Sequence, residues 1–181
     1  GAFFPPNIAF VSLPGKDDRA LQGLKTLAEE IGIGMMIYAP HQRAALGRER
    51  TINLWVRDQS PNWQTSLKMA SLDLSLLLTL QLQMNWGAHI NLICVVGDPD
   101  HEESARSFLN TLQVEARIPG DPGMMVIHDS FEEVLAKCPV ADINVLGMPT
   151  GINGEWMTRI TGLTRSSCLF VMASGKESAL A

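Results

Sequence analysis

The residues best placed to do chemistry are glycines that follow a short apolar run near the C-terminal end. This loop extends over Leu146-Gly-Met-Pro-Thr-Gly-Ile-Asn-Gly154 and leads into a helical pattern. Backbone N–H groups in a glycine-rich loop beside a helix N-terminus can cradle a phosphate group. The candidate nucleotide-binding residues are Gly151, Gly154, Gly162 and Thr164. Glycines that only make turns would give a similar pattern, so both interpretations stay open.

A second polar cluster lies between residues 98 and 103. Its members are Asp98, Asp100, His101, Glu102 and Glu103. Carboxylates grouped in this way can bind a divalent cation. However, Asp98 before Pro99 is typical of a helix start, and acidic residues in a first turn favour the helix by about 0.3–1 kcal/mol each. We interpret the cluster as a helix cap. Because no Cys or His pair has the spacing of metal ligands, no bound metal is predicted.

A basic loop follows Pro40 and ends before Thr51. Its basic residues are His41, Arg43, Arg48 and Arg50. Guanidinium groups bind phosphate and carboxylate groups in a bidentate way, so the loop could receive phosphate or an acidic partner surface. A solvated loop is the alternative.

Short apolar runs alternate with helical patterns, which predicts β-α units around a mostly parallel sheet. After residue 50 the expected strands are 52–56, 90–96, either 114–118 or 124–128, 143–146 and 168–172. The expected helices are 61–86, 99–112, 131–137 and 155–161. Ser130 and Glu133 predict a capping box at the start of the third helix. Residues 51–181 are thus expected to form one α/β subdomain.

Residues 1–50 contain one further βαβ unit. The expected strands are 8–13 and 33–39, with a helix near 17–31 between them. We expect this unit to be a partial first subdomain, either an edge extension of the same sheet or half of a pseudo-repeat. The chain begins with Gly1 rather than Met, which suggests a piece of a longer protein.

The segment Leu72 to Trp86 has apolar residues at every second position, which formally predicts a strand. A strand of this length would reach roughly 50 Å, and the residues are mostly good helix formers, so we predict a helix. Around a helix axis the apolar side chains point in all directions. One face of this helix is therefore expected to contact a partner.

Composition limits the possible functions. Hydrophobic residues make up 46% of the 181 residues and charged residues 18%, which excludes a disordered chain. A net charge of -5 argues against a general nucleic-acid binder. Three cysteines cannot all pair within the chain, which is typical of a reduced, cytosolic protein. Ser166 and Ser167 lack a glycine-flanked elbow, so acyl-transfer chemistry is not predicted.

From Thr51 to Met172, the order of elements and the glycine loop resemble the universal stress protein fold. In that family the nucleotide loop has two glycines separated by two residues, then nine residues, then Gly with Ser or Thr. Gly151 and Gly154 match the first part, but seven residues precede Gly162 and a leucine follows it. A free-standing universal stress protein that binds ATP at these residues is the alternative function.

Three segments are similar to the cytosolic C-terminal domain of the cation-chloride cotransporters. They are Arg48 to Asp58, the leucine-rich run Leu72 to Leu82, and Ile90 to Gly97. Those transporters carry an Asp-x-Trp-Trp type strand before a leucine-rich helix, and here the strand contains Asn53-Leu-Trp-Val56. Val56 replaces the second Trp, and Gln59-Ser-Pro61 replaces the glycine pair that usually follows. These departures suggest a prokaryotic or divergent member.

This resemblance implies a universal-stress-protein-like domain on the cytoplasmic side of the cell membrane. It implies that the domain forms a homodimer and tunes a symporter that moves chloride with sodium or potassium. The transmembrane domain of the same transporter would then be its second partner. We expect no catalytic residue, no metal, no cofactor and no nucleic-acid partner.

Overall fold

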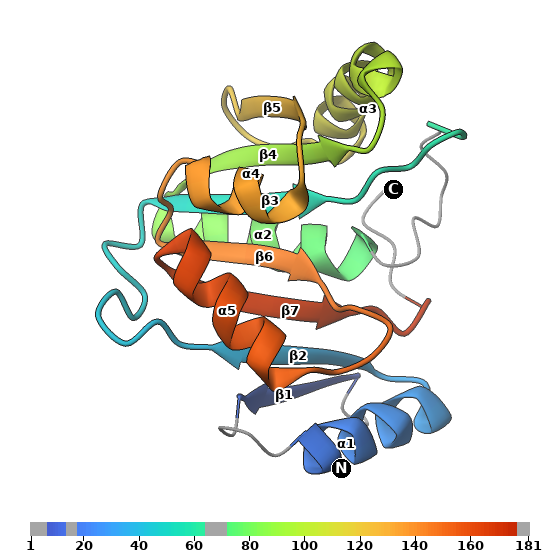
Figure 1. The fold of residues 1–181 in the computed structure, drawn as a ribbon, viewed down its shortest axis with the longest axis vertical. Coiled ribbons are helices and arrows are strands. Elements are labelled where there is room, and N and C mark those ends of the chain that lie inside the picture. Colours follow the sequence, from blue (N-terminus) through green and yellow to red (C-terminus); the bar gives the residue numbers. More distant parts are fainter. Residues whose placement is uncertain (1–6, 14–17, 64–71, 177–181) are drawn as a thin grey trace, which may run out of the picture.

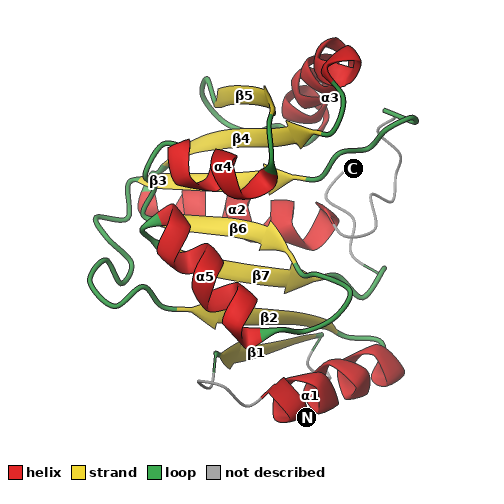
Figure 2. Ribbon diagram, in the orientation of Figure 1, coloured by secondary structure: helices red, strands yellow, loops and turns green. Residues whose placement is uncertain are grey.

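The computed structural model describes residues 7–13, 18–63 and 72–176. The strands are β1 (Ile8–Ser12), β2 (Gly34–Ala39), β3 (Thr51–Val56), β4 (His89–Val96), β5 (Gly123–His128), β6 (Ile143–Gly147) and β7 (Ser167–Met172). The helices are α1 (Asp18–Ile31), α2 (Leu72–Trp86), α3 (Glu102–Glu115), α4 (Phe131–Lys137) and α5 (Gly154–Thr164), with a short 3-10 helix (Pro99–His101) before α3. Figure 2 shows this alternation of helices and strands.

The seven strands form one sheet in the order β1-β2-β7-β6-β3-β4-β5 (Figure 1). Strands β3 to β7 are all parallel to one another. Only the β2·β7 pair is antiparallel, and β1 is parallel to β2. The predicted α/β fold with a mostly parallel sheet is therefore confirmed.

The antiparallel pair joins two similar units. β1-α1-β2 lies on one side of it and β6-α5-β7 on the other, so the strand order outward from the junction is the same in both directions. Both helices cover the same face of the sheet, where Leu21 of α1 and Met157 of α5 belong to one apolar cluster. The N-terminal unit thus extends the sheet of the larger one and is approximately related to β6-α5-β7 by a two-fold axis.

Both faces of the sheet are buried. One face packs against α2 and α3, and the other against α1, α4 and α5. In Figure 1, α4 and α5 lie in front of the sheet and α2 lies behind it. Burial on both faces explains why the strands are almost continuously apolar. Within the part of the chain that the structure describes, no helix combines the length and apolarity that a membrane crossing requires.

Helix α2 forms as predicted, at Leu72–Trp86. Its first turns are covered almost all round, since residues 72–76 and Thr79 are buried. Further along, its outer side is exposed and carries Leu77, Gln81, Met84 and Asn85. The expected helix start at Pro61 is wrong, because residues 61–63 form a turn and coil, and residues 64–71 lie outside the described residues.

One of the two alternatives for the third strand is confirmed, and one capping prediction is wrong. Residues 114–118 are not a strand, because α3 continues to Glu115 with its buried stripe ending at Leu112; the alternative at 124–128 is the strand. The capping box at Ser130 does not form. Asp129 intervenes instead, accepting the N–H of Ser130 at 2.8 Å and the Nζ of Lys137 at 3.1 Å. At the other predicted cap, the Asp98 side chain accepts the N–H of Asp100 as expected.

One carboxylate holds the C-terminal part of the loop between β2 and β3. Asp142 accepts the backbone N–H groups of Arg48, Arg50 and Thr51 at 2.7–2.9 Å, and the Thr51 hydroxyl at 3.0 Å. Gly47, at φ +60°, passes so close that a Cβ there would collide with this carboxylate. Burial alone would raise the pKa of Asp142, but these hydrogen bonds lower it below its usual value. Asp142 therefore fixes the connection between the N-terminal β1-α1-β2 unit and the larger part of the chain that begins with β3.

Replacing Asp142 by Asn should lower the free energy of unfolding at pH 7 by about 1–3 kcal/mol, because a charged acceptor of four hydrogen bonds becomes a neutral amide. The pKa of this carboxyl group is lower in the folded protein than in the unfolded chain, where it is about 3.9. The carboxylate therefore stabilises the folded state in full above about pH 3.9, and this contribution is lost as the pH falls through the folded-state pKa. The stability difference between wild type and variant, measured by urea unfolding, should therefore shrink below about pH 4.

Asp121→Asn, at an exposed loop position, is the matched control. It should leave both the stability at pH 7 and its acid dependence close to wild type. An Asp142→Asn protein as stable as wild type at pH 7 would show that this carboxylate does not hold the loop.

Candidate functional site

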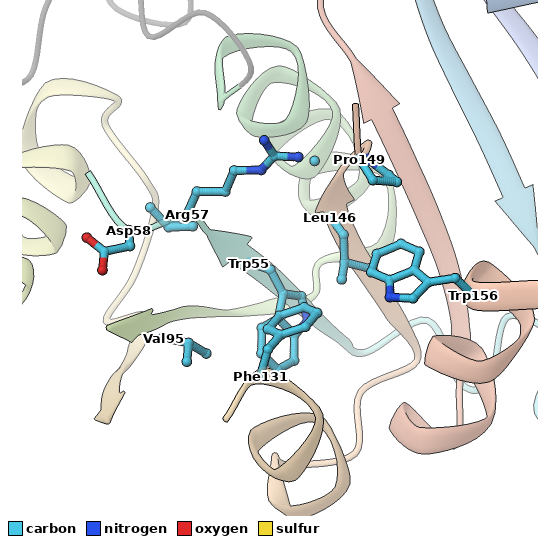
Figure 3. A pocket seen from close by; sticks show the side chains of 10 residues that line it. Trp55, Arg57, Asp58, Val95, Phe131, Leu146, Pro149 and Trp156 are labelled. Carbon is cyan, nitrogen blue, oxygen red and sulfur yellow. The ribbon is translucent and has the colours of Figure 1, made fainter. Parts of the chain in front are cut away.

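A crevice of about 290 Å³ opens beside the carboxyl ends of β3 and β6. The strands that follow β3 in the sequence lie on both sides of it in the sheet: β4 and β5 on one side, and β6 and β7 on the other. Open α/β sheets bind ligands at such a switch point. The sides of the crevice are formed by Trp55, Phe131, Leu146, Pro149 and Trp156, with Arg57 and Asp58 at its polar end (Figure 3).

Aromatic contacts build the crevice wall. The rings of Trp55 and Phe131 meet edge to face, with centroids 5.7 Å apart and planes at 80°. The ring of Trp156 packs against that of Phe170 of β7, with centroids 5.6 Å apart. Trp55 is buried, whereas Phe131, the first residue of α4, is 37% exposed. The wall therefore offers an apolar, aromatic surface to anything that enters.

A ladder of asparagines crosses the sheet beneath this wall. Asn91, Asn53 and Asn144 are register partners on β4, β3 and β6. Asn91 donates to Asn53 at 2.9 Å, and Asn53 donates to Asn144 at 3.1 Å. The Trp55 Nε1–H donates to the same Asn144 oxygen at 2.9 Å, while the Asn144 amide donates to Ser166 at 2.7 Å. The ladder thus orients the Trp55 indole.

Sequence reasoning missed this ladder. Its signal is a repeated tripeptide at the start of three strands, in which an asparagine stands between two apolar residues: Ile52-Asn-Leu54, Ile90-Asn-Leu92 and Ile143-Asn-Val145. A buried amide needs a partner, and only the register of three adjacent strands supplies one.

The charged groups at the end of the crevice bind backbone. Arg57 donates to the carbonyl of Met148 at 2.5 Å. Asp58 accepts the N–H groups of Ser60 at 2.8 Å and Gly97 at 3.1 Å. Burial would raise the pKa of Asp58, but these hydrogen bonds lower it. Both side chains therefore shape the loops that border the crevice.

The structure does not bring the four candidate nucleotide residues together. Gly151 lies in the loop after β6, and Gly154 is the first residue of α5. Gly162 and Thr164 lie at the other end of that helix, roughly 12–15 Å further along its axis at 1.5 Å per residue. The Thr164 hydroxyl is buried and donates to the carbonyl of Ile160 at 3.0 Å. The four residues therefore do not form one phosphate cradle.

The N-terminus of α5 already has acceptors from the chain itself. Gly154 donates its N–H to the carboxylate of Asp18 at 2.8 Å, and Trp156 donates to the Asn153 side chain at 2.8 Å. Asp18 is the first residue of α1, so this contact also ties the two halves together. A negative charge from the chain lies where a phosphate group would otherwise bind.

The other polar residues considered from the sequence do not come together in one site. Among the described residues, no group of three His, Cys, Asp or Glu side chains is arranged to hold a metal ion. The three cysteines are free and buried, and burial raises the pKa of Cys94 to about 12 and of Cys168 to about 11. In the basic loop, His41 and Arg43 line a second cavity, which Arg48 and Arg50 do not.

The fold is that of an α/β domain with a mostly parallel sheet, of the universal stress protein type. Residues 1–46 match the first part, and residues 47–180 the second part, of the family described as prokaryotic cation-chloride cotransporter, C-terminal domain. The chain therefore belongs to this family, as its resemblance predicted.

Solved structures that are similar to the chain include a cotransporter domain and a universal stress protein. The crystal structure of the cytoplasmic domain of a prokaryotic cation chloride cotransporter matches with a TM-score of 0.89 and 29% identity, over 99% of this chain and 68% of that one. A universal stress protein from Archaeoglobus fulgidus DSM 4304 matches with a TM-score of 0.54 and 14% identity, over 94% of this chain and 62% of that one, and shares the fold alone. No curated protein matches the chain.

Replacing Asn144 by Leu should leave the buried N–H of Trp55 without an acceptor, at a cost of about 1–3 kcal/mol in unfolding free energy. In a Trp55→Phe background that N–H is absent, so the same replacement should cost less. Urea unfolding of the two single variants and the double variant gives the coupling, expected at about 0.5–3 kcal/mol.

Asn110→Leu, at an exposed position of α3, is the control and should change stability by less than about 0.5 kcal/mol. Strictly additive effects of Asn144→Leu and Trp55→Phe would mean that the ladder does not position the indole.

Proposed function

We propose that this chain is the cytosolic regulatory and dimerisation domain of a cation-chloride symporter, without catalysis of its own and without a nucleotide at the glycine loop. The family match along nearly the whole chain carries the proposal. The parent protein would move chloride with sodium or potassium through its transmembrane domain. The present domain would lie on the cytoplasmic side of that membrane and bind the transmembrane part.

The chemistry of the crevice supports a role without catalysis. Arg57 and Asp58, its two charged residues, are engaged by backbone groups. The buried Cys94 and Cys168 have raised pKa values, which disfavours the reactive thiolate form. The contact of Asp18 with the start of α5 disfavours an added phosphate group there.

The outer side of α2 supports self-association. Leu77 is 37% exposed and Met84 75% exposed, and they lie seven residues apart on one side of the helix. The inner side of α2 already packs on the sheet, so these two side chains are free to meet another surface. Two copies related by a two-fold axis would bring the same apolar stripe together.

Two other exposed apolar positions allow the interface to be located. α1 exposes a stripe of its own, which includes Leu27 at 51%. Val114 of α3 is 75% exposed, as Met84 is, and serves as the matched control. Sedimentation should find the wild type dimeric and Leu77→Glu/Met84→Glu monomeric with an unchanged circular dichroism spectrum. Val114→Glu should remain dimeric, because it places the same charge outside the interface.

A wild type that sediments as a monomer at high protein concentration would contradict the dimer. Dissociation by Leu27→Glu instead would move the interface to α1. In the full-length transporter, the α2 double variant should change the chloride flux at equal membrane expression, whereas Val114→Glu should not. An unchanged flux would contradict the regulatory role.

A further inference from the structure

A second cavity, of about 380 Å³, lies at the edge of the sheet opposite the crevice. It sits where β2 ends beside the start of β7, since Ala39 pairs with Cys168. Leu13, Ala39 and Pro40 form its apolar part, and Thr158, Thr161 and Gly162 of α5 line another side. His41, Gln42 and Arg43 of the basic loop complete it. Both halves of the chain therefore contribute to the cavity.

The charge of the cavity is positive in an acidic chain. His41 and Arg43 are the titratable residues among the described residues that line it, and none of these described residues is a carboxylate, although the chain carries a net charge of -5. Within the described residues, Arg43 has no carboxylate in ion-pair distance. An exposed guanidinium beside a concave surface is suited to bidentate binding of an anion.

The loop is held in place without any ligand. The Nδ1 of His41 accepts the N–H groups of Ala44 at 3.1 Å and Arg43 at 3.4 Å, which leaves the ring proton on Nε2 as a donor. The backbone N–H of His41 donates to Ser167 at 2.9 Å, and Asp142 fixes the far end of the loop. A preorganised loop loses little conformational entropy when it binds.

The side of the cavity formed by α5 adds acceptors and open space. The hydroxyls of Thr158 and Thr161 donate to the carbonyls of Gly154 and Met157, so their oxygens can still accept a hydrogen bond from a ligand hydroxyl. A Cβ built at Gly162 would meet nothing within 4 Å. A larger side chain at this position can therefore extend into the cavity without a clash at its base.

We propose that this cavity binds a phosphate group carried by a small hydroxylated molecule or by a lipid headgroup. Arg43 and the Nε2–H of His41 would bind the phosphate, and the threonine oxygens would accept from the hydroxyls. Because the ligand would touch both halves of the chain, it would link them across the β2·β7 junction. Binding in this cavity would require neither dimerisation nor ion transport.

The test uses two probes at constant ionic strength. Glycerol phosphate, titrated by calorimetry, represents a soluble ligand, and phosphatidylcholine vesicles containing phosphatidylglycerol represent a headgroup. The wild type should bind at least one probe. Arg43→Gln should weaken that binding at least tenfold, and Gly162→Leu should block it while the protein stays folded. Arg48→Gln removes the same charge from the same loop outside the cavity and should stay within twofold of wild type.

Binding of glycerol phosphate that depends on Arg43 assigns a soluble ligand, and binding of vesicles alone that depends on Arg43 assigns a headgroup. Failure to bind either probe overturns the proposal. Equal weakening by Arg48→Gln and Arg43→Gln also overturns it, because that result would reflect the charge of the loop rather than the cavity.

Discussion

The antiparallel pairing of β2 with β7 is the interaction on which the rest of the molecule depends. Its register runs from Met35 opposite Met172 to Ala39 opposite Cys168. Without it, β1 and β2 would be a two-stranded unit of marginal stability, and β7 would expose an unpaired edge. Two carboxylates reinforce the same boundary: Asp18, which accepts the N–H at the start of α5, and Asp142, which accepts N–H groups of the basic loop. One continuous sheet results from two unequal parts.

Helix α5 connects this junction to both cavities. Trp156, near its start, borders the crevice at the carboxyl ends of β3 and β6, and Gly162, near its end, borders the basic cavity at the opposite edge. Between them, Met157 and Ile160 are fully buried against the sheet. A ligand in either cavity would therefore contact a helix whose position is set by the packing at the junction.

Much of the fold could be predicted from local sequence, because apolar runs and helical patterns depend on residues close together in the chain. The helix at Leu72–Trp86 could be identified despite its period of two, since its length and residue types excluded a strand. The asparagine ladder could not, because Asn53 and Asn144 meet only through strand register. The role of Asp142 could not be predicted either, since its hydrogen-bond partners lie more than 90 residues away in the sequence. Nor could the separation of Gly162 from Gly151 be predicted, because it depends on the helix α5 that lies between them.

Native-state hydrogen exchange of the β2 amides tests the central claim most directly. If the β2·β7 pairing makes one cooperative sheet, the amides of Met35 and Ile37, which face β7, should exchange with the same opening free energy as those of Leu92 and Ile93 in β4, which is the free energy of global unfolding. Exchange of the β2 amides at a free energy several kcal/mol lower, while β4 stays protected, would contradict the account, because the N-terminal unit would then open independently of the sheet it extends.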